Sequence, residues 1–313
     1  MSVSIELLSV RHRALRAELR RRALGQKAEL HAFSASDLYK ELIATQKAIL
    51  GVDGSDDRRD FFDLSPDQKK DADSVVAVLT RSAGLRDNGD GTSTLISEPF
   101  GTAEDLCSVE RFWTQPSTGC ASGVLVASDV VATAGHLVAP ASVTQMRFAF
   151  GYRMSSAAKA ETVLSNEEIY SGRSVLAFSP SAPEGGNDWA LVQLDRPVKN
   201  HRIAPVRRED RVKQGQGVHV IGFPRGLPLK YAGNARVRDN DAGAFFVANL
   251  DAFSGNSGSP VFNSETHEVE GILVRGGPDF EWVGACRRTL VCSTNGCQGH
   301  ECTRVTEFAA HVP

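Results

Sequence analysis

The spacing of hydrophobic positions changes once along the chain, near residue 74. Between about residues 5 and 50, leucines and isoleucines recur at helical spacing among charged residues and alanines, which predicts two helical segments. From residue 74 onward, short apolar runs typical of strands appear at 74–80, 122–127, 146–150 and 218–222. Asn-Gly and Asp-Gly pairs at 88–91 and a polar stretch at 263–268 predict hairpin turns. Many short strands joined by turns indicate a mostly β protein, a barrel or a sandwich.

Composition narrows the classes of function. The chain has 313 residues, of which 41% are hydrophobic and 23% charged, enough to form one large or two moderate cores. Its formal net charge of −3 argues against general nucleic-acid binding, which usually needs a basic surplus. No apolar run in the sequence approaches the length of a membrane span. We therefore expect neither nucleic acid nor a membrane among its partners.

A serine between two glycines is the strongest candidate for chemistry. Ser257 lies in the sequence GNSGSP at residues 255–260, and glycine at 255 permits backbone angles that other residues avoid. The backbone N–H groups of Gly255 and Ser257 can then point into one small space and hold an oxyanion. A serine hydroxyl is a weak nucleophile, so it also needs a base nearby.

Two further residues supply the expected base and its orienting carboxylate. His136 follows an apolar strand-like run that begins at residue 130, and Asp188 directly precedes another such run at 189–194. Asp195 is a competing carboxylate, but its neighbours Arg196 and Pro197 favour a turn with a surface ion pair. Each feature alone is common in proteins without a catalytic role. Together, in the order His, Asp, Ser, they match the template for acyl transfer by a catalytic triad.

These motifs resemble those of the chymotrypsin-like serine peptidases. That superfamily has three signature motifs, which correspond here to TAGH at 133–136, DWALV at 188–192 and GNSGSPV at 255–261. The bacterial branch that includes the glutamyl endopeptidases is the most similar, because of GNSGSPVFN at 255–263 and Gly-Phe-Pro at 222–224. The resemblance covers about residue 74 to the C-terminus. It implies two antiparallel six-stranded β-barrels, and a serine endopeptidase that works through an acyl-enzyme in the cleft between them.

The resemblance also sets the expected domain boundaries. Residues 1–52 form a helical extension and 53–73 a linker, with a short helix starting at Ser65-Pro66. The first barrel spans 74–200 and carries His136 and Asp188, and the second spans 201–313 and carries Ser257. In the zymogen-activated animal members of the family, an aspartate directly precedes the nucleophilic serine and pairs with a newly cut N-terminal amine. Here that position is the uncharged Asn256, so this mode of activation is not expected.

Specificity is predicted from the position six residues before the nucleophile. In the family that position lies at the base of the primary pocket, and Asp251 there implies cleavage after Arg or Lys; the alternative is that Asp251 pairs with a neighbour. Gly276 matches the glycine beside which a substrate backbone lies. Arg275 stands at a position where the family often has an aromatic residue. Its side chain could itself reach Asp251 and weaken the preference for Arg or Lys. Leu273 replaces the histidine of the glutamyl branch, which argues against glutamate specificity.

Six cysteines leave the cellular compartment open. The even count predicts three disulfides, one joining Cys107 to Cys120 and two within the tail, among Cys286, Cys292, Cys297 and Cys302. Their spacing lacks the Cys-x-x-Cys pattern of zinc knuckles, although His300 leaves a zinc alternative open. Disulfides imply a secreted or periplasmic protein, whereas the N-terminal sequence has no apolar core of signal-peptide length and favours the cytoplasm.

The N-terminal extension has two interpretations. It is either a prosegment that shields apolar surface, or a module that recruits a regulatory partner and gates the protease. Its basic cluster is interpreted as a solvated helix face and comprises Arg11, Arg13, Arg16, Arg20, Arg21 and Arg22.

The acidic run at 53–57 lacks the mid-loop glycine and the terminal glutamate of a calcium-binding loop, so no metal and no cofactor are predicted. The expected partner is a protein or peptide substrate. The competing functional class is a non-catalytic or partner-gated binding module on the same fold.

Overall fold

The computed structural model describes residues 56–81, 84–180, 186–290 and 298–313, together with single positions and short runs between 11 and 41. The chain divides into two compact units. The larger unit contains residues 57–99, 115–277 and 299–313, and the smaller one contains 1–56, 100–114 and 278–298. Each unit is described by itself below.

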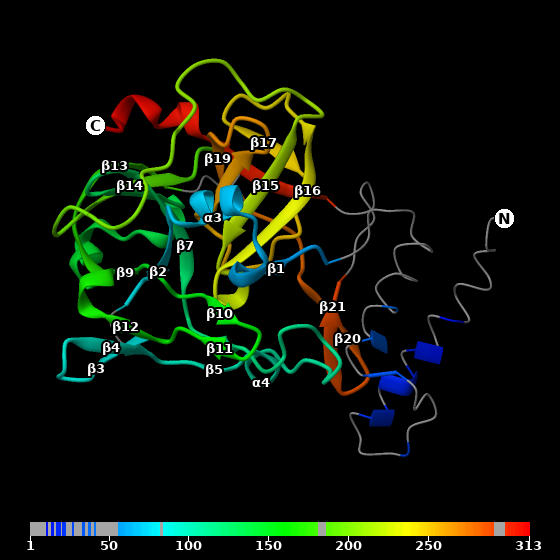
Figure 1. The fold of residues 1–313 in the computed structure, drawn as a ribbon. Helices are drawn as coiled ribbons and strands as arrows, with labels where there is room; N and C mark the ends of the chain where they lie inside the picture. Colours follow the sequence, from blue (N-terminus) through cyan, green and yellow to red (C-terminus); the bar gives the residue numbers. More distant parts are fainter. Residues whose placement is uncertain are drawn as a thin grey trace. The chain divides into compact units, whose positions relative to one another are not determined.

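The first barrel of the larger unit is a closed ring of six antiparallel strands (Figure 1). Its strands, in the order in which they pair, are β13 (Ile169–Ser179), β14 (Trp189–Leu194), β8 (Val130–Thr133), β7 (Ala121–Ala127), β2 (Val75–Leu79) and β9 (Arg147–Ala149). Ring closure comes from β13, which pairs with β14 along one part and with β9 along another. Because strand side chains alternate, Val76 and Val78 of β2 fill the barrel while Val75 and Leu79 join a second cluster outside it.

The second barrel also closes with six strands. The order is β16 (Lys230–Asp239), β15 (Gly217–Gly222), β18 (Pro260–Asn263), β19 (Val269–Arg275), β22 (His300–Arg304) and β17 (Phe245–Ala248), and β17 pairs back to β16. The two-residue strand β1 (Arg59–Asp60) adds to the outside of β16. The prediction of two six-stranded antiparallel barrels is therefore confirmed, as are the predicted strands at 74–80, 122–127, 146–150 and 218–222.

A shared apolar cluster joins the barrels. It includes Leu79 and Leu191 from the first barrel, Phe262 and Ile272 from the second, and Phe308 near the C-terminus, all almost fully buried. Burial of a side chain of this size contributes about 1.5–3 kcal/mol, so the cluster fixes the barrels against each other.

Smaller elements connect the strands. Ser65 caps α3 (Pro66–Ala72) in a capping box with Gln68, as the Ser-Pro start signal predicts. The predicted hairpin at 88–91 joins β3 (Leu85–Asp87) to β4 (Thr92–Leu95), and β12 (Val163–Ser165) extends this sheet. Two further strand pairs are β5 (Glu98–Pro99) with β6 (Pro116–Ser117) and β10 (Met154–Ser156) with β11 (Lys159–Ala160). Short 3-10 helices are η1 (Phe61–Asp63), η3 (Gly135–Leu137), η4 (Pro140–Gln145), η5 (Asn166–Glu168), η6 (Pro224–Gly226), η7 (Val305–Glu307) and η8 (Ala309–His311).

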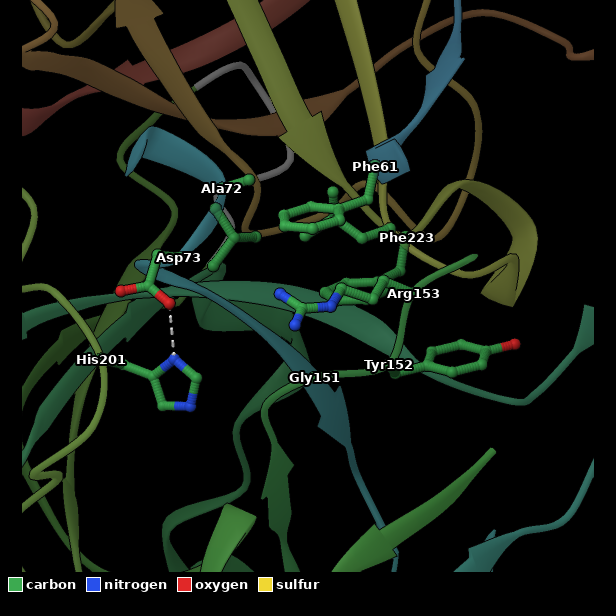
Figure 2. Close-up of a pocket in the computed structure, with 10 residues that line it drawn as sticks. Phe61, Ala72, Asp73, Gly151, Tyr152, Arg153, His201 and Phe223 are labelled. Carbon is green, nitrogen blue, oxygen red and sulfur yellow. Dashed lines mark hydrogen bonds and ion pairs between the residues drawn. The ribbon is translucent and has the colours of Figure 1, made fainter. Parts of the chain in front are cut away.

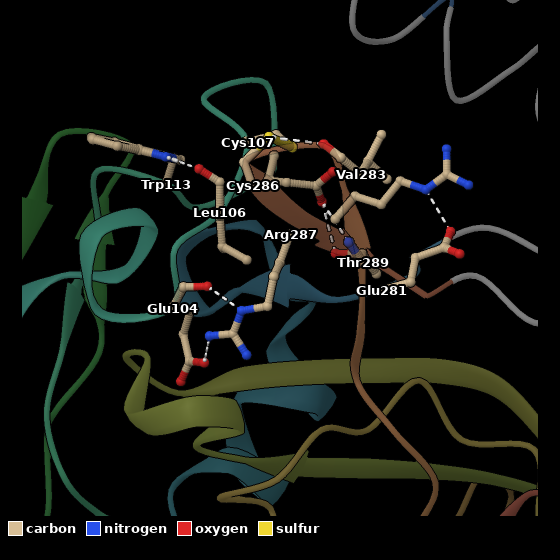
Figure 3. The surroundings of a disulfide bond; sticks show 11 residues. Glu104, Leu106, Cys107, Trp113, Glu281, Val283, Cys286, Arg287 and Thr289 are labelled. Carbon is tan, nitrogen blue, oxygen red and sulfur yellow. Dashed lines mark hydrogen bonds and ion pairs between the residues drawn. A yellow bond between two sulfur atoms is a disulfide. The ribbon is translucent and has the colours of Figure 1, made fainter.

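The smaller unit contains α4 (Phe100–Ala103) and the hairpin of β20 (Phe280–Val283) with β21 (Cys286–Thr289). A disulfide joins Cys107 to Cys286, whose Cα atoms are 5.0 Å apart (Figure 3). The backbone sets this pairing, because Arg287 donates to the Asp105 carbonyl and Cys107 donates to the Arg287 carbonyl, both at 2.8 Å. Next to the disulfide, the Arg287 guanidinium bonds the Glu104 carboxylate at 2.8 Å.

The predicted cysteine pairing was wrong. Cys107 does not bond Cys120, which is a free thiol just before β7, and Cys302 is a free thiol buried in β22. Sequence proximity suggested a short loop, whereas the actual partner lies 179 residues away on β21. Burial raises the pKa of the Cys120 thiol to about 12, so it is un-ionised at neutral pH. Cys292 and Cys297 lie outside the described residues.

In the N-terminal region, described residues between 11 and 22 and between 37 and 41 are helical. Leu15, Leu19 and Leu38 are buried and pack with Val109. The Glu18 carboxylate is fully buried and bonds Arg21 and Arg22, so part of the basic cluster is paired within its own helix. Among the helices that the structure describes, none combines the length and the apolar character needed to cross a bilayer.

Candidate active site

His136 sits in η3, immediately after strand β8 of the first barrel. Glycine at 135 is required there, because a Cβ atom would lie 2.3 Å from the Ser179 carbonyl oxygen. That close approach brings the histidine backbone against the start of β14. The side chain of His136 is 35% exposed, so one edge of the imidazole is available to a substrate while the other faces the protein.

Asp188 holds His136 by two hydrogen bonds. Its Oδ2 lies 2.8 Å from His136 Nδ1, and its Oδ1 accepts from the His136 backbone N–H at 2.9 Å. The carboxylate is fully buried, and burial alone disfavours its charge. The hydrogen bonds from His136 and the charges of His136 and Arg275 outweigh that effect, so the pKa of Asp188 is lowered. An ionised Asp188 keeps the proton on Nδ1 and leaves the Nε2 lone pair of His136 for proton transfer.

The turn before Ser257 orients the backbone N–H of Gly255. Asn256 N–H donates to the Phe253 carbonyl at 2.9 Å, and Gly255 at the third position has φ of +89°, which defines a type II turn. The Ser254 carbonyl accepts from the backbone N–H of Arg225. Since C=O and N–H of one trans peptide point in opposite directions, the Gly255 N–H points away from Arg225. No described residue accepts a hydrogen bond from the backbone N–H of Gly255 or of Ser257.

Ser122 on strand β7 of the first barrel ties this turn in place. Its hydroxyl donates to the Gly255 carbonyl at 2.9 Å and accepts from the Phe223 N–H at 3.0 Å, and its backbone N–H donates to the Ser257 carbonyl at 3.0 Å. Gly258 allows the approach, because a Cβ there would lie 2.1 Å from the Ser122 carbonyl oxygen. Sequence reasoning missed Ser122, since a serine within an apolar strand carries no motif.

The structure brings His136 and Asp188 into contact, but not His136 and Ser257. Among the described residues, none forms a hydrogen bond with the Ser257 hydroxyl. Such catalytic bonds are often long in the absence of substrate and tighten only in the complex. The competing carboxylate Asp195 pairs with Arg196 at 3.2 Å on the surface, which confirms its interpretation as an exposed ion pair.

The three residues predicted to bind substrate have the following contacts. The Asp251 carboxylate accepts a hydrogen bond of 2.7 Å from the backbone N–H of Asp57. Arg275 donates to Glu301 at 2.9 Å and lies 4.0 Å from Asp188 Oδ2, on the triad side. Gly276 packs against the His300 ring, where a Cβ would approach to 2.4 Å.

The segment that precedes the barrels packs against the residues around Asp251. Arg58 is almost fully buried, and its guanidinium stacks 3.8 Å above the ring of Phe253. Together with the Asp57 bond to Asp251, this contact places residues 57–58 against residues 251–253. No sequence pattern predicts this contact, because the two segments are almost 200 residues apart.

A separate pocket lies near α3 and contains none of the triad residues. Figure 2 shows the residues that line it, which are Phe61, Ala72, Asp73, Val75, Gly151, Tyr152, Arg153, His201, Phe223 and Leu229. His201 bonds Asp73 through Nδ1 at 3.0 Å and Glu168 through Nε2 at 2.5 Å. Burial opposes a charge on His201, but the bonds to the two carboxylates outweigh it and raise its pKa.

This arrangement predicts a pH-dependent contribution to stability. A raised pKa in the folded state means that His201 stabilises the fold fully below pH of about 6.5, and that this contribution is lost as the pH rises through the folded value. Replacement by glutamine should therefore lower the free energy of unfolding more at pH 5.5 than at pH 9. Urea unfolding at both pH values checks this, with His311→Gln as control. An equal loss at the two pH values would contradict it.

Comparison with protein families finds a peptidase domain within the larger unit. Residues 121–272 match the family of the trypsin-like peptidase domain. Similar solved structures include the active form of the Rv3671c protease from M. tuberculosis, at 15% identity, covering 79% of this chain and 82% of that chain with a TM-score of 0.45. A Glu endopeptidase in complex with MPD is 16% identical, with coverages of 84% and 96% and a TM-score of 0.49. The scabies mite inactivated protease paralogue S-I1 is 18% identical, with coverages of 82% and 96% and a TM-score of 0.48.

The matched peptidase domain and the two closed barrels define the class of the protein. Residues 121–272 carry a trypsin-like peptidase domain, and together with the two closed antiparallel barrels this match supports the chymotrypsin-like serine peptidase superfamily. It is a serine endopeptidase, and its substrates are proteins or peptides.

Proposed function

We propose that the enzyme hydrolyses peptide bonds with Ser257 as nucleophile, His136 as general base and acid, and Asp188 as the residue that orients His136. The observation that carries this proposal is the two-point attachment of His136 to the buried Asp188 carboxylate, at 2.8 and 2.9 Å. With the proton held on Nδ1, His136 Nε2 can accept the Ser257 hydroxyl proton when a substrate brings the two side chains together.

The reaction then follows from these roles. Ser257 Oγ bonds to the scissile carbonyl carbon as its proton moves to His136 Nε2. The backbone N–H groups of Gly255 and Ser257 stabilise the resulting oxyanion, and the type II turn supports this by aiming the Gly255 N–H away from Arg225. The C–N bond breaks as His136 returns the proton to the leaving amine. Water, deprotonated by His136, then attacks the carbonyl carbon of the Ser257 ester. The bond from that carbon to Ser257 Oγ breaks as His136 returns the proton to Oγ, which releases the acid and restores the serine.

For substrate choice, we propose a preference for Arg or Lys on the acyl side of the scissile bond, set by Asp251. The support is its position six residues before Ser257 and the charge type of its carboxylate, which is complementary to Arg and Lys. Gly276 stands at the position of the family's glycine beside which an extended substrate backbone lies.

Peptide-library cleavage tests this proposal. Mass spectrometry of the products should show cuts after Arg and Lys, and Asp251→Asn should lower kcat/KM for those sites by about 100- to 1,000-fold, the range for loss of a close charge pair. The matched control is Asp239→Asn, an exposed aspartate on β16. Cleavage after acidic or apolar residues, unchanged in Asp251→Asn, would refute the specificity. Absence of cleavage at any site would instead favour the binding-module alternative.

A further inference from the structure

A second cluster of titratable side chains lies outside the candidate active site. Asp71, His219 and His267 come from three separate segments, yet the atoms they could offer to a metal ion all lie within 4.8 Å of one another. His219 Nε2 is 3.2 Å from Asp71 Oδ2, and His267 Nδ1 is 2.6 Å from the same oxygen. The cluster thus gathers two imidazoles around one carboxylate oxygen.

The fold explains why these residues meet. Asp71 lies in the last turn of α3, His219 in the middle of β15, and His267 in the turn between β18 and β19. Val218 and Val220 point into the core of the second barrel, so His219 between them points to the opposite face of the strand. The side chains of Asp71 and His219 are 1% and 2% exposed, whereas that of His267 is 35% exposed. The cluster is therefore buried on two sides and open to solvent on the third.

We propose that Asp71, His219 and His267 bind a divalent transition-metal ion of the Zn²⁺ class. Neutral imidazole nitrogens and a carboxylate oxygen are the ligands such ions prefer. With metal–ligand distances of about 2.0–2.2 Å in tetrahedral geometry, neighbouring ligand atoms lie about 3.4 Å apart. The separation of 3.2 Å between His219 and Asp71 already fits, and the separation of 2.6 Å between His267 and Asp71 must open by less than about 1 Å. His267 is the ligand best able to move, since it lies in a partly exposed turn.

The surroundings supply the other parts of such a site. His219 Nδ1 lies 3.3 Å from Ser264 Oγ, a partner that can hold the ring proton on Nδ1 and leave Nε2 for the metal. The exposed side near His267 leaves room for water as a fourth ligand. Arg202 lies 3.8 Å from Asp71 Oδ1, the oxygen that does not face the histidines. Its side chain is 42% exposed, so solvent screens its repulsion of the ion.

The ion would act as a clip and would take no part in hydrolysis. Asp71 is 148 residues from His219 and 196 residues from His267, and it lies just before β2, the first strand of the first barrel. A metal bond between these positions would fasten the segment that enters the first barrel onto the second barrel. The free energy of metal binding is then added to the stability of the fold.

Metal titration of the full-length, metal-free protein tests the proposal. Zn²⁺ should bind with one ion per chain by calorimetry and raise Tm. Co²⁺, used as a spectroscopic substitute, should show a tetrahedral spectrum without a thiolate charge-transfer band. His267→Asn should weaken Zn²⁺ affinity by about 100-fold, since loss of even an outer-sphere partner costs 10- to 100-fold. Asparagine suits the variant because it tolerates the φ of +60° at this position and can still donate to Asp71.

The matched control is His311→Asn, which removes an exposed histidine outside the cluster and should bind Zn²⁺ as the unmodified chain does. Three results would each overturn the proposal. They are absence of Zn²⁺ binding in the full-length protein, unchanged affinity in His267→Asn, and a Co²⁺ spectrum dominated by thiolate ligands.

Discussion

Replacement of Ser257 by alanine is expected to lower kcat by about a million-fold, with little change in KM or in the stability of the fold. The reason is that alanine removes the only group proposed to form the acyl-enzyme, while the Gly255 and Ser257 N–H groups and the cleft remain. The turn should persist, since Ser122 holds it through the carbonyls of residues 255 and 257 rather than through the Ser257 hydroxyl. Single-turnover hydrolysis of a peptide that the enzyme cleaves measures the loss.

The control for this prediction is Ser156→Ala, which removes an exposed hydroxyl on β10 and should leave kcat unchanged. If Ser257→Ala retained kcat within about tenfold of the unmodified enzyme, another residue would have to be the nucleophile. The roles assigned to His136 and Asp188 would then lose their basis as well.

Asp188→Asn is expected to lower kcat by about 10,000-fold at neutral pH, because it reverses the tautomer of His136. The backbone N–H of His136 donates to one oxygen of residue 188, so the asparagine carbonyl takes that position. The asparagine NH₂ group then faces Nδ1 and donates to it, which puts the imidazole proton on Nε2. With that proton facing Ser257, His136 cannot act as a base. Steady-state kinetics measures the loss, and NMR of the His136 ring protons measures the tautomer.

Asp195→Asn provides the matched control, because it makes the same chemical change at the exposed carboxylate that pairs with Arg196. It should leave kcat within a factor of two. A comparable fall in both variants would mean that the effect of Asp188→Asn reflects general charge loss rather than control of the His136 tautomer.

Local sequence patterns predicted the framework of the fold. Short apolar runs bounded by turn residues marked strands such as β2 and β15, because each of these strands is buried on one or both faces. The site candidates were found in the same way. At Gly135 and Gly255 another backbone segment comes too close for any side chain, so glycine is required there. Each glycine lies within two residues of His136 or Ser257, and each motif is therefore short and continuous in the sequence.

Contacts between distant segments could not be predicted from the sequence. The support from Ser122 and the cluster around Asp71 depend on which strands and turns the barrels bring together. The disulfide partner of Cys107 depends in the same way on how distant segments meet within the smaller unit. Asp251 shows the same limit, because its bond to the Asp57 amide follows from the path of residues 57–60 beside β16. A single sequence records residue types along one dimension and gives no register between segments almost 200 residues apart.

The central claim is that Ser257 is a nucleophile activated by His136 and Asp188. A fluorophosphonate probe tests it most directly, because the probe bonds covalently only to an activated serine. Peptide mapping of the labelled full-length protein should place one adduct per chain on Ser257, with no labelling of Ser257→Ala and strongly reduced labelling of Asp188→Asn. An adduct on another serine, or equal labelling of Ser257→Ala, would contradict the account.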